Sequence, residues 1–387
     1  MNKFYYLHMI LSVVVACVVT TRSTAQNLSP YIHKVYEYRP APGQFINELP
    51  EYEDGDTEND MRLKAEESIA EHEEMMISLG GWGGYVIFGF DHMIENRPGE
   101  YDLKICGNAF YANANPKDTT ALGGSAEPGI VMVSYDANGN GRPDDTWYEL
   151  AGSEYNNPLT KKNYRCTYHR PSAGHVATPD MSYTFLNDTT YVPWEDNYGE
   201  TGYISKNVYH KQNYYPNWIE EDEMTFIGSR LRNNGQDESG NGSYYVLYCF
   251  DWGYVDNQPN KQGYTATDQP LDVVVPHPSE FMLDWAVDEA GNSVTLPGIH
   301  FVKVYNGVNQ YNGWLGECST EVMDAWDLHM LDADGKEIAD GIGCVAPVNG
   351  NSPAEIYTAN GMRVGDFSRP GLYIVRENGK TRKFMVK

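Results

Sequence analysis

From Gly83 onward, apolar and polar residues alternate or form short apolar runs, and β-branched and aromatic residues fill most of the apolar positions. These patterns are typical of β-strands, and turn clusters such as Arg97-Pro98-Gly99 separate them. The pattern predicts at least nine strands, at 85–90, 101–105, 129–135, 147–150, 164–169, 224–227, 244–250, 301–305 and 325–331.

No helical pattern lies between these strands, so parallel strands joined by helices are not expected. We predict a mainly β fold for residues 26–345, an antiparallel β-sandwich of jelly-roll type with long loops. The longest loops are expected at 171–216 and 258–278, and loops of that length on a sheet scaffold are usually functional or disordered.

One segment has helical spacing. Apolar residues recur every three or four positions between Met61 and Leu79, which predicts a helix over about 60–79. Asn59 or Asp60 can cap its start, and Gly80 can end it.

The two ends of the chain differ from this domain. Residues 1–25 combine Lys3, an apolar run and the small residues Ser23-Thr24-Ala25, which is typical of a signal peptide. We therefore expect export to the outer-membrane surface or the exterior; lipoprotein processing at Cys17 stays an alternative. Residues 346–387 predict a linker followed by a small, basic β segment.

The net charge of the 387 residues is −26, which argues against nucleic-acid binding, because contacts with phosphates need a basic surface. After the signal peptide, no apolar segment is long enough to span a bilayer, so the protein is not expected to be membrane-spanning.

A loop directly after the strand at 129–135 has the pattern D-x-N-x-N-G-x-x-D-D. Oxygen ligands at alternate positions, with glycine at the sixth, suit Ca²⁺. The twelfth position is Trp147 where an EF-hand has Glu, so Asp145 or Glu149 has to supply a further carboxylate. An ordinary Asn/Gly/Asp turn is the alternative. We predict a structural calcium site at Asp136, Asn138, Asn140, Arg142 (through its carbonyl), Asp144 and Asp145.

Catalytic motifs are missing from the sequence. Paired carboxylates for glycoside hydrolysis can be drawn from Glu127, Glu149, Glu317 and Glu321, but the sequence does not place them at a working separation. Asp256, with Asp251 and Asn257, is a weaker candidate for a second ion or ligand site.

Aromatic residues crowd the stretch 171–216 and the residues just after it. Exposed rings next to amides can bind sugars or flat macrocycles. The alternative is that these rings pack the loop onto the sandwich. The candidate ligand-binding residues are Trp194, Tyr209, Tyr214, Tyr215 and Trp218.

Five segments together resemble a family of bacterial cell-surface proteins of poorly defined function: 35–45, 80–85, 106–110, 126–130 and 316–322. The resemblance implies an accessory role in cobalamin uptake, with an outer-membrane transporter as partner. The segment 356–375 is similar to the C-terminal sorting domain of type IX secretion cargo, which implies transport across the outer membrane.

The function expected from these features is non-catalytic capture of an external glycan or cobamide by an exported, calcium-stabilised β-sandwich. The alternatives are an enzyme that acts on polysaccharide through paired carboxylates, and a structural or adhesion protein of the cell surface.

Overall fold

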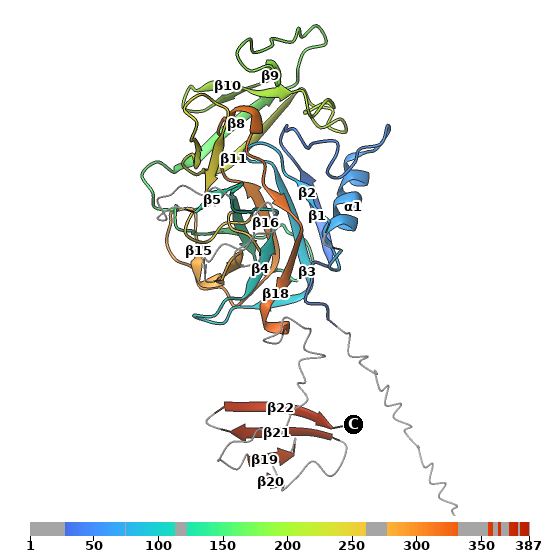
Figure 1. Cartoon of the computed structure of the whole chain (residues 1–387). Helices are drawn as coiled ribbons and strands as arrows, with labels where there is room; N and C mark the ends of the chain where they lie inside the picture. The colour runs from blue at the N-terminus through green and yellow to red at the C-terminus, as the bar shows by residue number, and fades with distance from the viewer. Residues whose placement is uncertain are drawn as a thin grey trace, which may run out of the picture.

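A computed structural model describes residues 28–73, 75–112, 122–260 and 277–331, together with the backbone of strands between residues 355 and 386 (Figure 1). The predicted signal peptide, 1–25, lies outside the described residues, as does the stretch 332–354. Every pair of named strands is antiparallel and one α-helix is present in the described part, so the predicted mainly β class is confirmed. No helix in that part is long and apolar enough to cross a membrane.

The largest sheet has six strands, in the order β1-β3-β16-β6-β7-β15. Strand β16 pairs with β3 on one side and with β6 on the other, so it joins the N-terminal and middle parts of the chain. Most residues of strands β3, β16 and β6 are buried, in runs that include both faces of the sheet, and Val86, Val131 and Val302 are among them. The strands are β1 (Lys34–Arg39), β3 (Tyr85–Glu95), β6 (Gly129–Ser134), β7 (Trp147–Leu150), β15 (Ala286–Val287) and β16 (Gly298–Asn306).

A second sheet of four strands, at the top of Figure 1, has the order β10-β9-β8-β11. Its strands are β8 (Lys161–His169), β9 (Leu186–Asp196), β10 (Thr201–Asn207) and β11 (Glu223–Arg230). Strands β9 and β10 lie in the stretch 171–216 that the sequence predicted as loop. The prediction is wrong for these residues because β9 is rich in polar residues and includes Pro193, and pairing with β8 and β10 stabilises it as a strand.

Shorter sheets complete the fold, and all nine predicted strands overlap strands of the structure. The sheet β12-β13-β5 comprises β5 (Gly123–Gly124), β12 (Gly235–Asp237) and β13 (Tyr245–Tyr248). The sheets β14-β4-β18 and β17-β2 comprise β2 (Ile77–Ser78), β4 (Leu103–Cys106), β14 (Glu280–Phe281), β17 (Glu321–Val322) and β18 (Asp324–Asp327). Near the C-terminus, a separate sheet comprises β19 (Glu355–Thr358), β20 (Arg363–Val364), β21 (Gly371–Glu377) and β22 (Lys380–Val386).

Helix α1 (Glu58–Ile69) begins and ends earlier than predicted. Thr57, and not Asn59 or Asp60, is the N-cap, and it forms a capping box with Asp60. The helix ends at Ile69 because Ala70 is extended and the next two residues have positive φ. The residues predicted as its last turns include β2, which pairs with β17. Long-range strand pairing therefore overrides the helical spacing there.

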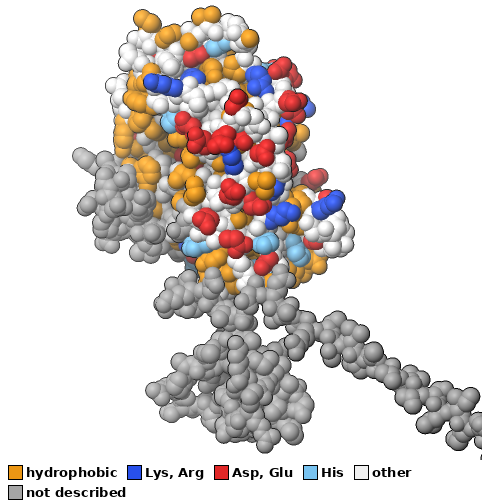
Figure 2. Space-filling view, turned by 90° about the vertical axis from the view of Figure 1, so that its right-hand side faces the viewer, with side chains coloured by type: hydrophobic (Ala, Val, Ile, Leu, Met, Phe, Trp, Pro, Cys, Tyr) orange, Lys and Arg blue, Asp and Glu red, His pale blue; other side chains and the backbone are white. Residues whose placement is uncertain are grey.

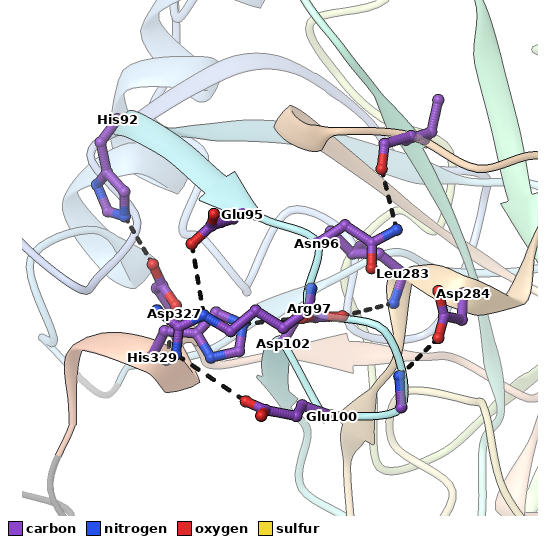
Figure 3. Close-up of polar contacts among 12 residues, drawn as sticks. His92, Glu95, Asn96, Arg97, Glu100, Asp102, Leu283, Asp284, Asp327 and His329 are labelled. Atoms are coloured by element: carbon purple, nitrogen blue, oxygen red, sulfur yellow. Dashed lines mark hydrogen bonds and ion pairs between the residues drawn. The ribbon is translucent and has the colours of Figure 1, made fainter. Parts of the chain in front are cut away.

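Histidine–carboxylate pairs connect β3 with β18, and the residue before β4 with the segment after β18 (Figure 3). His92 Nε2 lies 3.0 Å from Asp327 Oδ2, and its Nδ1 lies 2.8 Å from Asp91 Oδ1. His329 Nε2 lies 2.8 Å from Oδ1 of Asp102, which is fully buried. Burial lowers the pKa of His92, but the hydrogen bonds and charges of Asp327 and Asp91 outweigh this effect, so its pKa is raised.

The raised pKa of His92 makes stability depend on pH. A group whose pKa is higher in the folded state stabilises the fold fully below the unfolded pKa of about 6.5, and this contribution is lost as pH rises through the folded value. We expect the free energy of unfolding to fall over that window, and His92→Gln to flatten the fall. Urea unfolding across the pH range measures this effect. His33→Gln, at an exposed histidine, is the control; equal slopes for the wild type and His92→Gln would contradict the prediction.

Candidate functional site

Three carboxylates that are far apart in the sequence meet inside the fold. Glu127 lies just before β6, Asp256 lies between β13 and β14, and Glu321 is the first residue of β17. One carboxylate oxygen from each lies within 4.8 Å of the other two. Asp256 and Glu321 are buried, and Glu127 is partly buried. We call these three residues the acidic centre.

Backbone N–H groups hold Asp256 in place. Its Oδ1 accepts hydrogen bonds from the amides of Asn108 and Ala109, each at 2.7 Å, and its Oδ2 accepts one from Glu321 N at 3.0 Å. A Cβ at Gly107 would lie 2.4 Å from Asp256 Oδ1, so only glycine allows this close approach. The three donors come from two separate segments, which joins those segments at the acidic centre.

Ser319 connects the other two carboxylates. Its amide donates to Glu127 Oε1 and its hydroxyl donates to Glu321 Oε1, each over 2.9 Å. The hydroxyl also lies 2.7 Å from Ser78 Oγ. All of these donors are neutral, and in the described part of the chain no salt bridge with Lys, Arg or His involves the acidic centre.

Burial raises the pKa of each carboxyl group of the acidic centre. For Glu127, the charges of Glu321 and Asp256 add to the effect of burial, and Asp256 likewise raises the pKa of Glu321. Burial raises the pKa of Asp256 to about 7. Protons or a cation therefore have to offset the repulsion, and three converging carboxylate oxygens are a donor set that suits Ca²⁺ or Mg²⁺. These three residues could hold a divalent cation.

A pocket of about 150 Å³ lies beside this region. Its wall combines aromatic rings with amides, a guanidinium group and a carboxyl group. The residues that supply these groups are Trp82, Tyr168, Trp194, Tyr203, Tyr311, Asn233, Asn309, Gln310, Arg230 and Glu317. We call it the aromatic pocket. Strands β8, β9, β10 and β11 contribute to it, together with the segment after β16.

Glu317 lines the aromatic pocket and is 9% exposed. Its Oε1 accepts a hydrogen bond from Gln44 N at 2.6 Å, whereas its buried Oε2 has no partner among the described residues. Burial raises the pKa of Glu317 to about 7. Buried polar atoms normally have partners, so this region is suited to a bound ligand or to water.

The position of Trp194 depends on a glycine on the neighbouring strand. Gly202 of β10 pairs with Trp194 of β9, and a Cβ at residue 202 would lie 2.4 Å from the indole ring. The absence of a side chain at Gly202 lets the indole lie against β10. Tyr203 and Tyr311 are about half exposed at the pocket. The pocket therefore offers both a partly buried ring and accessible rings.

Of the aromatic residues predicted to bind a ligand, Trp194 lines the aromatic pocket. The expectation of exposed rings is wrong for Tyr214, Tyr215 and Trp218, because all three are buried in the hydrophobic core. Trp218, for example, stacks on Tyr38 with ring centroids 6.0 Å apart. Tyr209 is 66% exposed and is not among the residues that line the pocket. The three buried rings therefore pack into the hydrophobic core, as the alternative expected.

The predicted calcium loop lies between β6 and β7 and is held by its own polar groups. Asp136 accepts hydrogen bonds from Asn140 N at 3.1 Å and Gly141 N at 2.8 Å. The side-chain amides of Asn138 and Asn140 both donate to Asp144, over 3.0–3.1 Å. The side chains of Asn138 and Asn140 therefore contact Asp144, and Asp136 holds the backbone of the loop, an arrangement that an ordinary Asn/Gly/Asp turn also forms.

Of the two candidates for a further carboxylate ligand, Asp145 contacts the loop and Glu149 contacts other strands. Asp145 Oδ2 accepts a hydrogen bond from Ala137 N at 3.1 Å, so Asp145 belongs to the loop. Glu149 instead contacts Ser229 and Lys162 on other strands. Arg142 donates its backbone N–H to Asn140 Oδ1 at 2.8 Å.

Comparison with known proteins leaves the family open. No protein-family model matches the chain, and a search of curated proteins finds no match.

The surface carries the negative charge that the composition gives the chain. Acidic side chains form a band across the face shown in Figure 2.

From the sequence, Glu127, Glu317 and Glu321 were candidates for a carboxylate pair, and Asp256 was a candidate for a separate ion or ligand site. The sequence did not show that these residues lie in one region. Three of the five segments on which the expected resemblance rests, 106–110, 126–130 and 316–322, contribute residues there. The gaps of 129 and 65 residues within the acidic centre (256 − 127 and 321 − 256) explain why spacing gave no signal.

The raised pKa of Glu317 predicts a second dependence of stability on pH. In the unfolded chain this carboxyl group ionises near its ordinary pKa of about 4.3, whereas the folded protein keeps the proton until about pH 7. The folded state binds more protons over that window, so the free energy of unfolding falls as pH rises, by up to about 1.4 kcal/mol per pH unit.

Because the carboxyl groups of the acidic centre also have raised pKa values, we expect Glu317→Gln to reduce this slope by up to about 1.4 kcal/mol per pH unit, measured by urea unfolding. Glu289→Gln, at an exposed glutamate on the turn after β15, is the matched control and should keep it. A Glu317→Gln profile parallel to that of the wild type would contradict a raised pKa at Glu317.

Proposed function

We propose that this protein is an exported, cell-surface binding protein that captures one sugar unit of an external glycan in the aromatic pocket. The observation that supports the proposal is the composition of the pocket wall. It combines aromatic rings, amides, the guanidinium group of Arg230 and the carboxyl group of Glu317, whose Oε2 has no partner among the described residues. Export is inferred from the signal peptide predicted at 1–25 and from the likeness of 356–375 to a sorting tail.

The volume of the pocket favours a glycan over a cobamide. A cavity of about 150 Å³ accommodates one six-membered ring, as small aromatic ligands in engineered cavities of that size show. A corrin macrocycle is several times larger and could only contact the rim. We therefore place a cobamide second among the ligands, with an outer-membrane transporter as its expected partner.

Each part of the wall suits one part of a sugar. Trp194, Tyr203 and Tyr311 offer ring faces for the apolar face of a pyranose. Asn309, Gln310 and Arg230 can hydrogen-bond to hydroxyl groups, although Arg230 already forms an ion pair with Glu200 at 3.1 Å. Oε2 of Glu317 can accept from a hydroxyl when ionised, or donate to a ring oxygen when protonated.

We expect calorimetry against a glycan panel to find a ligand, and Trp194→Ala and Glu317→Gln each to weaken its binding at least tenfold. The physical reason is the loss of a stacking surface in the first variant and of a charged hydrogen-bond partner in the second.

Tyr209→Ala is the matched control, because Tyr209 is exposed and lies outside the pocket lining. It should bind like the wild type. No heat of binding with any glycan or with cobalamin would reject the proposed capture. If the protein releases shortened glycan and Glu317→Gln abolishes this release, the enzyme alternative is favoured.

We also propose that the loop between β6 and β7 binds Ca²⁺ as a structural ion. The contacts of Asn138 and Asn140 with Asp144, and of Asp136 and Asp145 with the backbone of the same loop, support the proposal. The carbonyl of Arg142 would be a further ligand, as the motif implies.

Ca²⁺ at millimolar concentration is expected to raise the melting temperature, and Asp136→Ala to abolish the rise. Differential scanning calorimetry with Ca²⁺ or with a chelator measures the shift. Asp288→Ala, in a similar exposed turn at the end of β15, should keep the calcium effect. A wild-type melting temperature that is indifferent to Ca²⁺ would reject the site.

A further inference from the structure

A larger cavity, of about 360 Å³, shares no lining residue with the aromatic pocket and includes no residue of the acidic centre. Strands β7, β8 and β11 and the turn at 288–291 contribute to its wall. Three polar side chains of the wall contact one another: Glu149 of β7, Lys162 of β8 and Ser229 of β11. The function proposed above does not use any of them.

A β-bulge brings Lys162 and Ser229 together. Gly228 pairs with Tyr164 and Arg230 pairs with Lys161, so Ser229 faces two residues of β8, Lys162 and Asn163. Asn163 has a φ of 51°, in the left-handed region, which asparagine tolerates better than most residues. Bulges redirect side chains and are frequent beside active sites.

The three groups lie within hydrogen-bond distance of one another. Ser229 Oγ donates to Glu149 Oε2 at 2.7 Å, and Lys162 Nζ donates to Ser229 Oγ at 3.2 Å. Lys162 Nζ also lies 3.5 Å from Glu149 Oε1 and above the ring of Tyr155. The backbone N–H of Ser229 donates to Tyr305 Oη at 3.0 Å, which fixes the backbone of the bulge.

This geometry has the parts of an activated nucleophile: a hydroxyl, an acceptor for its proton and a cation next to both. Burial raises the pKa of Glu149, which makes it a stronger base, and lowers the pKa of Lys162. Perturbed titratable groups in a cavity are a common mark of catalytic sites.

We propose that Ser229 is the nucleophile of a second activity, the hydrolysis of a carboxylic ester with a small acyl group. Glu149 is its general base, and Lys162 is the hydrogen-bond donor to the carbonyl oxygen of the ester. The proposal is independent of glycan capture in the aromatic pocket.

In the first step, Ser229 Oγ attacks the ester carbon and its proton passes to Glu149. The bond from that carbon to the alcohol oxygen breaks, and the leaving alkoxide takes the proton from Glu149. In the second step, Glu149 takes a proton from water, whose oxygen attacks the acyl carbon. The acyl–Oγ bond breaks, Ser229 recovers the proton, and the free acid leaves. Lys162 stabilises the negative oxygen in both steps.

The test uses the full chain with 4-nitrophenyl acetate as substrate and a fluorophosphonate as covalent probe. We expect ester hydrolysis above the buffer rate, and a probe adduct that peptide mass spectrometry places on Ser229. Ser229→Ala should lower kcat/KM at least 100-fold and abolish the adduct, and Lys162→Met should lower kcat about 100-fold with a smaller change in KM.

Ser134→Ala is the matched control, because Ser134 is also a buried serine on a strand, β6, and its Oγ has no partner among the described residues. It should retain full activity. If Ser229→Ala fails to fold, the position of the wild-type adduct decides the question. Absence of hydrolysis and of an adduct in the folded wild type, or an adduct elsewhere, overturns the proposal and leaves a structural polar network.

Discussion

The pairing of β16 on both of its edges is the constraint on which the rest of the structure depends. β16 joins β3 to β6, and its last residue, Asn306, is fully buried. The side-chain amide of Asn306 donates to the carbonyls of Gly80, at 2.7 Å, and Cys318. These bonds join two segments, 80–82 and 316–318, that contribute residues to the wall of the aromatic pocket. Glu127 precedes β6, and Glu317 and Glu321 follow β16, so the position of β16 also determines where the carboxylates meet.

The carboxylates illustrate how desolvation and neutral donors oppose each other. Removing three carboxylates from water is unfavourable unless protons, a cation or hydrogen bonds compensate. Backbone amides and serine hydroxyls compensate only in part, so the pKa values of the three carboxyl groups stay raised. Glu317 differs from the acidic centre because one of its oxygens lacks a partner and its side chain lines a pocket. That difference is why we assign ligand binding to the aromatic pocket and at most a cation to the acidic centre.

The second cavity has a different basis. Its polar side chains, Glu149, Lys162 and Ser229, hydrogen-bond to one another. The features that draw attention to this cavity are the β-bulge and the left-handed backbone of Asn163. Local irregularity of this kind is retained only where the surroundings enforce it. Here the packing of Gly228 against Tyr305 does so, since a Cβ at residue 228 would lie 3.0 Å from that ring.

The sequence by itself determined the β class, the approximate positions of nine strands and the polar loop at 136–145, because alternation and turn chemistry are local properties. Only the tertiary structure decided that the helix ends at Ile69, that 186–207 forms strands and that Tyr214 and Tyr215 are buried. It also decided which carboxylates meet, and that Glu149 contacts Ser229 and Lys162 and lies apart from the calcium loop. The physical reason is that strand pairing and burial depend on residues far away in the chain, and spacing along the sequence carries no record of them.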